Sequence, residues 1–170
     1  GADDGLTYPA GPMDKAAQKT LSGALKAATG REGADVVYDA VGGDYAEPAL
    51  RAMDWNGRYL VVGGAGSLEV APGVRLVTTP NFPPQYKAEA SKGAEFLDLL
   101  RQQSDLNWTF LSPSALFVAG ERTGKFRLGT DQLLTAADGK SSISFEDFAV
   151  ALADEIERPA HLRQRFTVGY

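Results

Sequence analysis

Short apolar runs alternate with amphipathic segments along this chain, and the alternation predicts an α/β fold. Four runs rich in Val, Tyr and Phe lie between turn residues, and they cover residues 36–41, 58–62, 108–112 and 165–169. Runs of this length and composition are typical of buried strands in a parallel sheet. We therefore expect these four segments to be the main strands of one sheet.

Three longer segments have apolar residues three and four positions apart, which predicts helices. Asp14 is placed to cap a helix that runs to about Ala28, and a second helix is expected over residues 86–102. Ser144 opens an S-x-x-D capping pattern with Asp147, and Pro159 ends the helix that follows. The residues expected to be buried on this last helix are Phe145, Phe148, Ala149, Leu152 and Ile156.

The remaining segments predict shorter elements. Asp44 is placed to cap a short helix over 45–53, and Asn56-Gly57 predicts a turn. Residues 67–85 contain four prolines and are expected to form a long loop, whereas residues 126–134 could add a strand or a hairpin arm.

Strands that alternate with helices imply a parallel sheet with right-handed crossovers. We expect residues 1–170 to form a single Rossmann-like domain of the α/β class, with about four main strands and helices on both faces. Strand 36–41 would lie at an edge without a partner inside the chain. Because a long apolar edge promotes association, we expect a homodimer through the strand 36–41 edge.

Composition narrows the partners and the compartment. The net charge of −5 leaves no basic stripe for nucleic acid, and no apolar run is long enough to span a membrane. The chain contains no cysteine, which excludes disulfides and thiolate metal sites. We expect a cytoplasmic protein without a metal.

Two stretches resemble two different families of NAD(P)-binding proteins. The sequence GADVVYDAVGGDYAEPALRAMDWNGRYLVVG, residues 33–63, resembles the coenzyme domain of zinc-independent quinone oxidoreductases of the medium-chain dehydrogenase family, and GADDGLTYPAG before it looks like the same source. From about Leu60 to the end, VVGGAGSLEVAPGVRLVTTP, WTFLSPSALF, GERTGKFRLGTDQLL and RFTVGY resemble atypical short-chain dehydrogenases of the NADH-flavin-reductase-like, epimerase-related kind. We interpret the chain as a composite of both, natural or engineered, with a junction near residues 60–66; the alternative is a divergent member of one family.

Both resemblances imply a glycine-rich loop, G-x-G-x-x-G or a close relative, whose amides hold the pyrophosphate of the cofactor. This motif is missing from the chain, and the nearest match, GGAGS at 63–67, leads into a proline-rich loop where the fingerprint requires a helix. The first half of the nucleotide-binding fold is therefore expected to be lacking, and NAD(P) binding is expected to be weak or absent.

Candidate cofactor-binding residues lie where the predicted strands end, because doubly wound sheets bind ligands at the carboxyl ends of their strands. By resemblance these loops look toward the nicotinamide half of the cofactor. The candidates are Val41, Gly42, Gly43, Gly63, Gly64, Ala65, Ser112 and Pro113. The alternative is that the glycines only permit tight turns and that Ser112-Pro113 only ends a strand.

No catalytic residue can be assigned. Tyr86 lacks the lysine four residues later that short-chain dehydrogenases use for proton transfer, so a packing role is expected for it. The segment GERTGK, residues 120–125, has the wrong spacing for a P-loop, and we expect Arg122 and Lys125 to lie in a solvated loop.

Two further polar residues have no expected chemistry. His161 is the only histidine, no carboxylate lies at helical spacing to help it, and a surface position is expected. Asp39 is attributed to the edge position of its strand.

Three functions stay open at this point. The first is a composite domain of NAD(P)-dependent oxidoreductase ancestry without a complete dinucleotide site. The second is an NAD(P)H-dependent quinone or flavin reductase, truncated here or completed by a partner subunit. The third is an interaction module that uses its open sheet edge. Whether the chain is an enzyme is left undecided.

Overall fold

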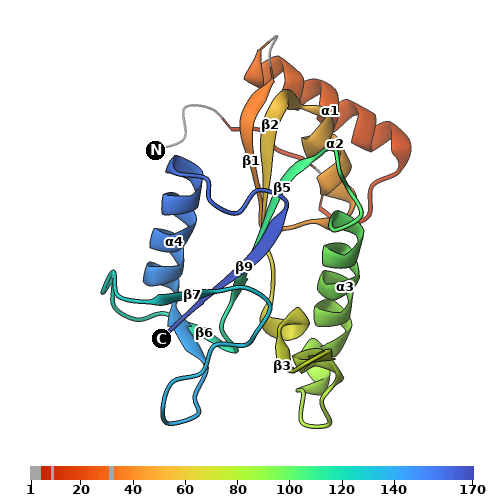
Figure 1. Ribbon diagram of the computed structural model, residues 1–170. Coiled ribbons are helices and arrows are strands. Elements are labelled where there is room, and N and C mark those ends of the chain that lie inside the picture. Colours follow the sequence, from red (N-terminus) through yellow and green to blue (C-terminus); the bar gives the residue numbers. More distant parts are fainter. Residues whose placement is uncertain (1–4, 9, 31–32) are drawn as a thin grey trace. The chain divides into compact units, whose positions relative to one another are not determined.

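A computed structural model describes residues 5–8, 10–30 and 33–170 of the chain (Figure 1). The chain divides into two compact units, which meet in the sequence between Val61 and Val62. Each unit is described by itself below. Strand pairing in both is mostly parallel, and helices lie between the strands along the chain.

In the first unit, α1 (Lys15–Thr29) begins where the sequence predicts. The Asp14 side chain accepts a hydrogen bond from the Ala17 amide at 2.8 Å, which caps the helix. The chain leaves the helix at Gly30, whose φ of +79° is a conformation that glycine adopts without strain.

The strands of the first unit are β1 (Ala34–Asp39) and β2 (Met53–Val62), which pair in parallel. A 3-10 turn, η1 (Gly43–Tyr45), and the short helix α2 (Ala46–Arg51) connect them. The pairing is regular from Val36 opposite Arg58 to Asp39 opposite Val61, so the carboxyl ends of the two strands lie side by side.

Two local predictions for this unit are wrong. Asn56-Gly57 makes no turn between elements but lies inside β2, where the register shifts between Ala34 and Val36 and Trp55 is 95% exposed. Asp44 does not cap α2, which begins without a side-chain cap; its carboxylate accepts a hydrogen bond from the Met13 amide at 2.8 Å instead. A competing long-range donor therefore decides the role of this carboxylate.

The second unit is built on β5 (Asn107–Pro113) and β9 (Gln164–Gly169), which pair in parallel. The short strand β7 (Arg127–Gly129) pairs antiparallel with β9, as the expected hairpin arm. The side chains of Leu111, Phe166 and Val168 form a buried core with Phe148 and Ala151 of α4 (Phe145–Glu157). Burial of these apolar side chains is the main contribution to the stability of this unit.

Helix α4 buries only part of the face that its apolar pattern predicts, since Phe148 is buried and Leu152 packs against the core. Its Ser144 cap is confirmed, since the hydroxyl accepts from the Asp147 amide at 3.0 Å. Phe145 is 46% exposed and Ala149 is also exposed. The buried residues are Asp147, Phe148, Ala151 and Glu155, and two of these are carboxylates that accept hydrogen bonds there.

The proline-rich segment is shorter as a loop than the sequence suggests. It contains η2 (Ala65–Ser67), the hairpin of β3 (Glu69–Ala71) and β4 (Val74–Arg75), and η3 (Leu76–Thr78). Helix α3 (Pro84–Leu100) then begins at the last of the prolines. The remaining strands, β6 (Leu116–Val118) and β8 (Ser142–Ser144), pair in parallel with each other.

Candidate functional site

The carboxyl end of β1 is organised by a buried aspartate. Asp39 is 8% exposed, and its Oδ1 accepts hydrogen bonds from the amides of Val41 and Gly42 at 2.8 and 2.7 Å. Its Oδ2 accepts a hydrogen bond from the hydroxyl of Tyr59 on β2. Asp39 is therefore an anchor of the loop after β1, and the prediction that only its edge position explains it is wrong.

Tyr59 is fully buried, and its phenol is held neutral. Burial raises the pKa of Tyr59 well above its usual range, and the hydrogen bond to Asp39 raises it further. The pair lies under the loop that contains Val41, Gly42 and Gly43. Because Asp39 takes the first two amides of this loop, those amides do not point toward a ligand.

A hollow of about 400 Å³ lies along β1 in the first unit. Its lining is mainly apolar and aromatic, and it reaches Val41 at the carboxyl end of the strand. The aromatic side chains at the hollow belong to Tyr8, Tyr38 and Tyr45, and the aliphatic ones include Leu21, Leu25 and Val37. Such a surface suits an apolar or planar partner rather than a phosphate.

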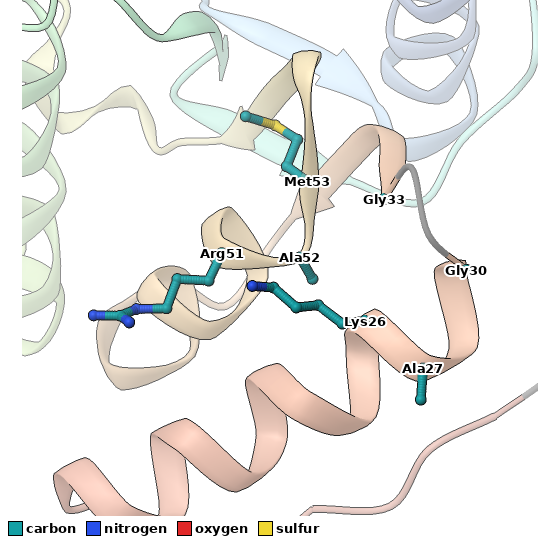
Figure 2. A pocket seen from close by; sticks show the side chains of 7 residues that line it. All are labelled: Lys26, Ala27, Gly30, Gly33, Arg51, Ala52 and Met53. Carbon is teal, nitrogen blue, oxygen red and sulfur yellow. The ribbon is translucent and has the colours of Figure 1, made fainter.

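A second hollow, of about 600 Å³, lies at the opposite ends of the strands (Figure 2). It is lined by residues that precede β1 and β2, among them Gly33 and Ala52, and the Lys26 side chain extends from α1 toward the end of α2. Arg51 at its rim is already paired with Glu47. Both cations lie in the last turns of helices, where they stabilise the helix dipoles, so we do not assign this hollow as the ligand site.

In the second unit, the candidates Gly63, Gly64 and Ala65 differ sharply in their surroundings. The Gly63 amide donates to the Leu111 carbonyl at 2.8 Å, and a Cβ on Gly63 would lie 2.0 Å from the ring of Phe110. Gly63 is thus required by close packing. Gly64 is exposed, and a Cβ there would meet nothing within 4 Å, so the space beside its Cα is open.

The end of β5 is buried rather than open. Ser112 is 0% exposed, Pro113 is buried, and the hydroxyl of Ser114 donates to the Val168 carbonyl at 2.9 Å. The Ser112 hydroxyl accepts from the guanidinium of Arg165 at 3.4 Å. Its side chain therefore faces the interior of this unit.

Arg165 is a residue that the sequence reasoning missed. Its side chain is 1% exposed and forms an ion pair with Asp131, to which its Nε donates at 2.8 Å. Burial lowers the pKa of Arg165, whereas Asp131 raises it. Burial would raise the pKa of Asp131, but hydrogen bonds and charge from Arg165 and Arg101 lower it below its usual value. The sequence does contain one indication of this role, because Arg165 is a charged residue at a buried position of the otherwise apolar run RFTVG.

The loop at 120–125 is fixed to the start of α4. Asp147 accepts from the Thr123 hydroxyl and from the Gly124 amide, the latter at 2.8 Å, and Glu146 accepts from the Gly120 amide at 2.9 Å. Burial would raise the pKa of Asp147, but the hydrogen bonds that it accepts from Thr123, Gly124 and Tyr170 lower it. Arg122 and Lys125 are exposed, as expected for a solvated loop.

Two predictions about single residues are wrong. His161 is no surface residue: its side chain is 21% exposed, its Nδ1 lies 2.7 Å from Glu155, and its ring stacks on Phe166. Tyr86 does not pack at the start of its helix but is 57% exposed. Glu155 lies six positions before His161, so a search at helical spacing overlooks it.

Rossmann folds bind a diphosphate with free amides at a helix N-terminus. Among the described residues, three helices have eight or more residues, and none of their N-termini suits a diphosphate. Asp14 already caps α1, α3 begins with Pro83 and Pro84, and the first turn of α4 carries Glu146 and Asp147. Negative charge or missing N–H groups therefore oppose a phosphate at each of them.

Comparison with known proteins identifies the class and then the family. The α/β fold is Rossmann-like, and two solved structures that share 36% identity with the chain match 90% and 88% of it. The sequence profile of the NAD(P)H-binding family matches residues 13–159, and the chain belongs to this family. The expected fold class is thereby confirmed.

Two solved structures and two curated proteins illustrate the relationship. A Bacteroides thetaiotaomicron protein, provisionally named an epimerase, shares 36% identity with a TM-score of 0.77, covering 90% of this chain and 72% of its own. A Streptococcus pneumoniae protein, provisionally named an NADH-flavin reductase, shares 36% identity with a TM-score of 0.74, covering 88% and 77%. Bacillus subtilis YwnB is 50% identical over 114 residues, and rat quinone oxidoreductase-like protein 2 is 38% identical over 66 residues.

The chain spans 54% of the length of YwnB and 17% of that of the rat protein, matching them over 65% and 39% of its own residues. In the described part of the chain, no helix is long and apolar enough to cross a membrane. Across those same residues no group of three or more His, Cys, Asp or Glu side chains is arranged to hold a metal.

We predict that Tyr59→Phe lowers the free energy of unfolding at neutral pH by about 1.5–3 kcal/mol, because buried Asp39 loses a hydrogen-bond donor. Above about pH 10 the unfolded wild-type chain ionises Tyr59 while the folded chain keeps it neutral, so wild-type stability falls as pH rises. The difference in free energy of unfolding between wild type and variant should then narrow. Urea unfolding from neutral to high pH measures this difference, with exposed Tyr86→Phe as the control. A gap that stays constant would contradict this assignment.

Proposed function

We propose that this chain is an NAD(P)-dependent oxidoreductase-derived domain that offers only the nicotinamide-facing part of a dinucleotide site. The observation that carries the proposal is the loop after β2, where Gly64 is exposed and has open space beside its Cα, where a Cβ would lie. Family membership supports the cofactor, and the position at the carboxyl end of a strand supports the location.

Weak binding follows from the groups that surround the candidates. The amides of Val41, Gly42 and Gly63 donate to acceptors within the protein, and the long helices of the described chain present no fitting phosphate site. When bound, the cofactor would supply a hydride. Gly64 and Ala65 are the residues we propose to contact it, and Gly63 would keep their loop against Phe110.

A second function has support from a specific comparison. The relatives include a protein provisionally named an NADH-flavin reductase and one named quinone oxidoreductase-like. On this proposal the domain is part of a cytoplasmic NAD(P)H-dependent quinone or flavin reductase, in which a partner or a longer polypeptide supplies the phosphate contacts. Flavin or quinone reduction by NAD(P)H that these 170 residues support only together with such a partner or longer polypeptide would favour it over the first function.

We expect NADPH to bind the wild-type chain with a Kd on the order of 0.1–1 mM, about −4 to −5.5 kcal/mol. Two-dimensional amide NMR should show shifts centred on Gly64 and Ala65. Gly64→Val should abolish these shifts without unfolding the chain, because its side chain enters open space at an ordinary φ of −107°.

Gly93→Ala is the matched control for this titration, since a Cβ at that position in α3 also meets nothing within 4 Å. It should bind NADPH like the wild type. Shifts that survive Gly64→Val, or the absence of any shift at millimolar NADPH, would contradict the proposed site.

We also propose that the chain is a composite with its junction near residues 60–66. The two compact units divide between Val61 and Val62, at that junction. The curated relatives match 66 and 114 residues, lengths close to those of the two segments of resemblance. The family profile extends across the junction, as a join between two related folds in register would allow.

The composite origin predicts a specific outcome of separate comparisons. Residues 1–63 alone should match quinone oxidoreductases better than epimerase-related proteins, and residues 64–170 alone should do the reverse. A single relative that is most similar to both segments would refute the composite and leave a divergent member of one family.

The remaining proposal concerns association with another chain through the sheet edge, the surface that the interaction-module hypothesis also uses. In the described chain β1 is an edge strand of its sheet, and it lies along the apolar hollow that Tyr38 and Val41 help to line. Exposed strand edges and apolar grooves promote pairing with another chain. We therefore propose a homodimer through this edge.

Light scattering after size exclusion should give twice the chain mass of 18.1 kDa for the wild type. Tyr38→Lys places a charge on the edge and should give the monomer mass. Tyr86→Lys alters a tyrosine of similar exposure on α3 and should remain dimeric, since Tyr38 is 51% and Tyr86 57% exposed. A monomeric wild type would rule out this association.

A further inference from the structure

The guanidinium of Arg165 contacts several separate segments of the second unit. It projects from β9 and is 1% exposed. Its Nη1 lies 3.3 Å from the Ser67 hydroxyl and 3.4 Å from the Ser112 hydroxyl, and its Nη2 lies 3.4 Å from the Ser67 carbonyl. A single planar cation thus links η2, the end of β5 and β9.

Asp131 supplies the counter-charge and extends the network. It accepts from Nε and Nη2 of Arg165, and its own carbonyl accepts from the Glu69 amide at 2.8 Å. Glu69 begins β3, two residues after Ser67. The chain is therefore held by Arg165 at Ser67 and again, through Asp131, at Glu69.

This arrangement has more specificity than stability requires. A buried charge carries a large desolvation cost, and apolar residues of similar size often replace such pairs without loss. The other inward positions of β9 are apolar or hydroxyl side chains, Phe166, Thr167 and Val168. What a guanidinium adds is a fork of fixed geometry that reaches several acceptors at once.

We infer that Arg165, held by Asp131, is a positioning residue that fixes the loop Gly63–Ser67 against the end of β5 and thereby shapes the nicotinamide-facing site. The inference rests on the proposed function for its ligand. It assigns no contact between Arg165 and the cofactor, because the guanidinium is buried beneath the loop. Its effect on the ligand passes through Ser67 and the backbone that precedes it.

The decisive variant is Arg165→Lys, which retains the charge but has only one ammonium group in place of the fork. Reduced nicotinamide mononucleotide is the probe, because it carries the nicotinamide half without the adenosine half. We expect its Kd to rise about tenfold or more, the scale on which misplacement of a supporting group acts. Hydrogen exchange at the amides of residues 64–68 should accelerate by a similar factor, since the loop opens more easily.

Glu155→Gln is the matched control. Glu155 is also a buried ionic residue, 4% exposed, and it bonds to His161 and Ala160 rather than to the loop. It should lower the unfolding midpoint but leave both readouts unchanged. Wild-type behaviour of Arg165→Lys in either readout, or equal changes in Glu155→Gln, would overturn the inference.

The two proposals fail in different ways. If the wild-type chain binds neither the mononucleotide nor NADPH, the proposed function is wrong and Arg165 has no site to shape. Hydrogen exchange still decides whether Arg165 fixes the loop, because that readout needs no ligand. If the wild type binds and Arg165→Lys binds equally well, the proposed function stands and the positioning role is wrong.

Discussion

A guanidinium that is almost wholly shielded from water must find every partner within the protein, and this constraint organises the second unit. Asp131, Ser67 and Ser112 come from segments far apart in the sequence, and Arg165 donates hydrogen bonds to all three. Because a partly satisfied buried charge is costlier than an apolar core, the fold of this unit admits few alternative arrangements of the loop after β2. Asp39 acts similarly in the first unit, where it orders the loop after β1.

These two anchors also limit the chemistry of the strand ends. In many nucleotide-binding folds the loops after parallel strands offer backbone amides to a ligand. Here an aspartate and a carbonyl accept the amides of Val41, Gly42 and Gly63. What remains is open space beside exposed glycine, which suits a planar group better than a phosphate. Membership of the NAD(P)H-binding family is therefore compatible with strand ends that offer few backbone amides to a ligand.

The main elements could be predicted from the sequence because they depend on local pattern. Strand β9 and the caps at Asp14 and Ser144 follow from apolar runs and from side chains that bond three residues ahead. Asp44, whose donor is 31 residues away, and Arg165, whose acceptor Ser67 is 98 residues away, could not be predicted in this way. A charge within an apolar strand signals a buried partner, but its identity depends on tertiary contacts. The candidate site was predictable as a set of strand ends, and the division of its glycines into packed Gly63 and open Gly64 was not.

The two tryptophans are distributed in a way that makes each a reporter for one unit. Trp55 belongs to the first unit and is 95% exposed, whereas Trp108 belongs to the second and is 2% exposed, with a buried Nε1 that has no hydrogen-bond partner among the described residues. An indole in water emits at longer wavelength than one in an apolar interior. Collisional quenchers would therefore reduce the long-wavelength emission of Trp55 first and leave the short-wavelength emission of Trp108. The intrinsic fluorescence of this chain thus separates into two signals without any added label.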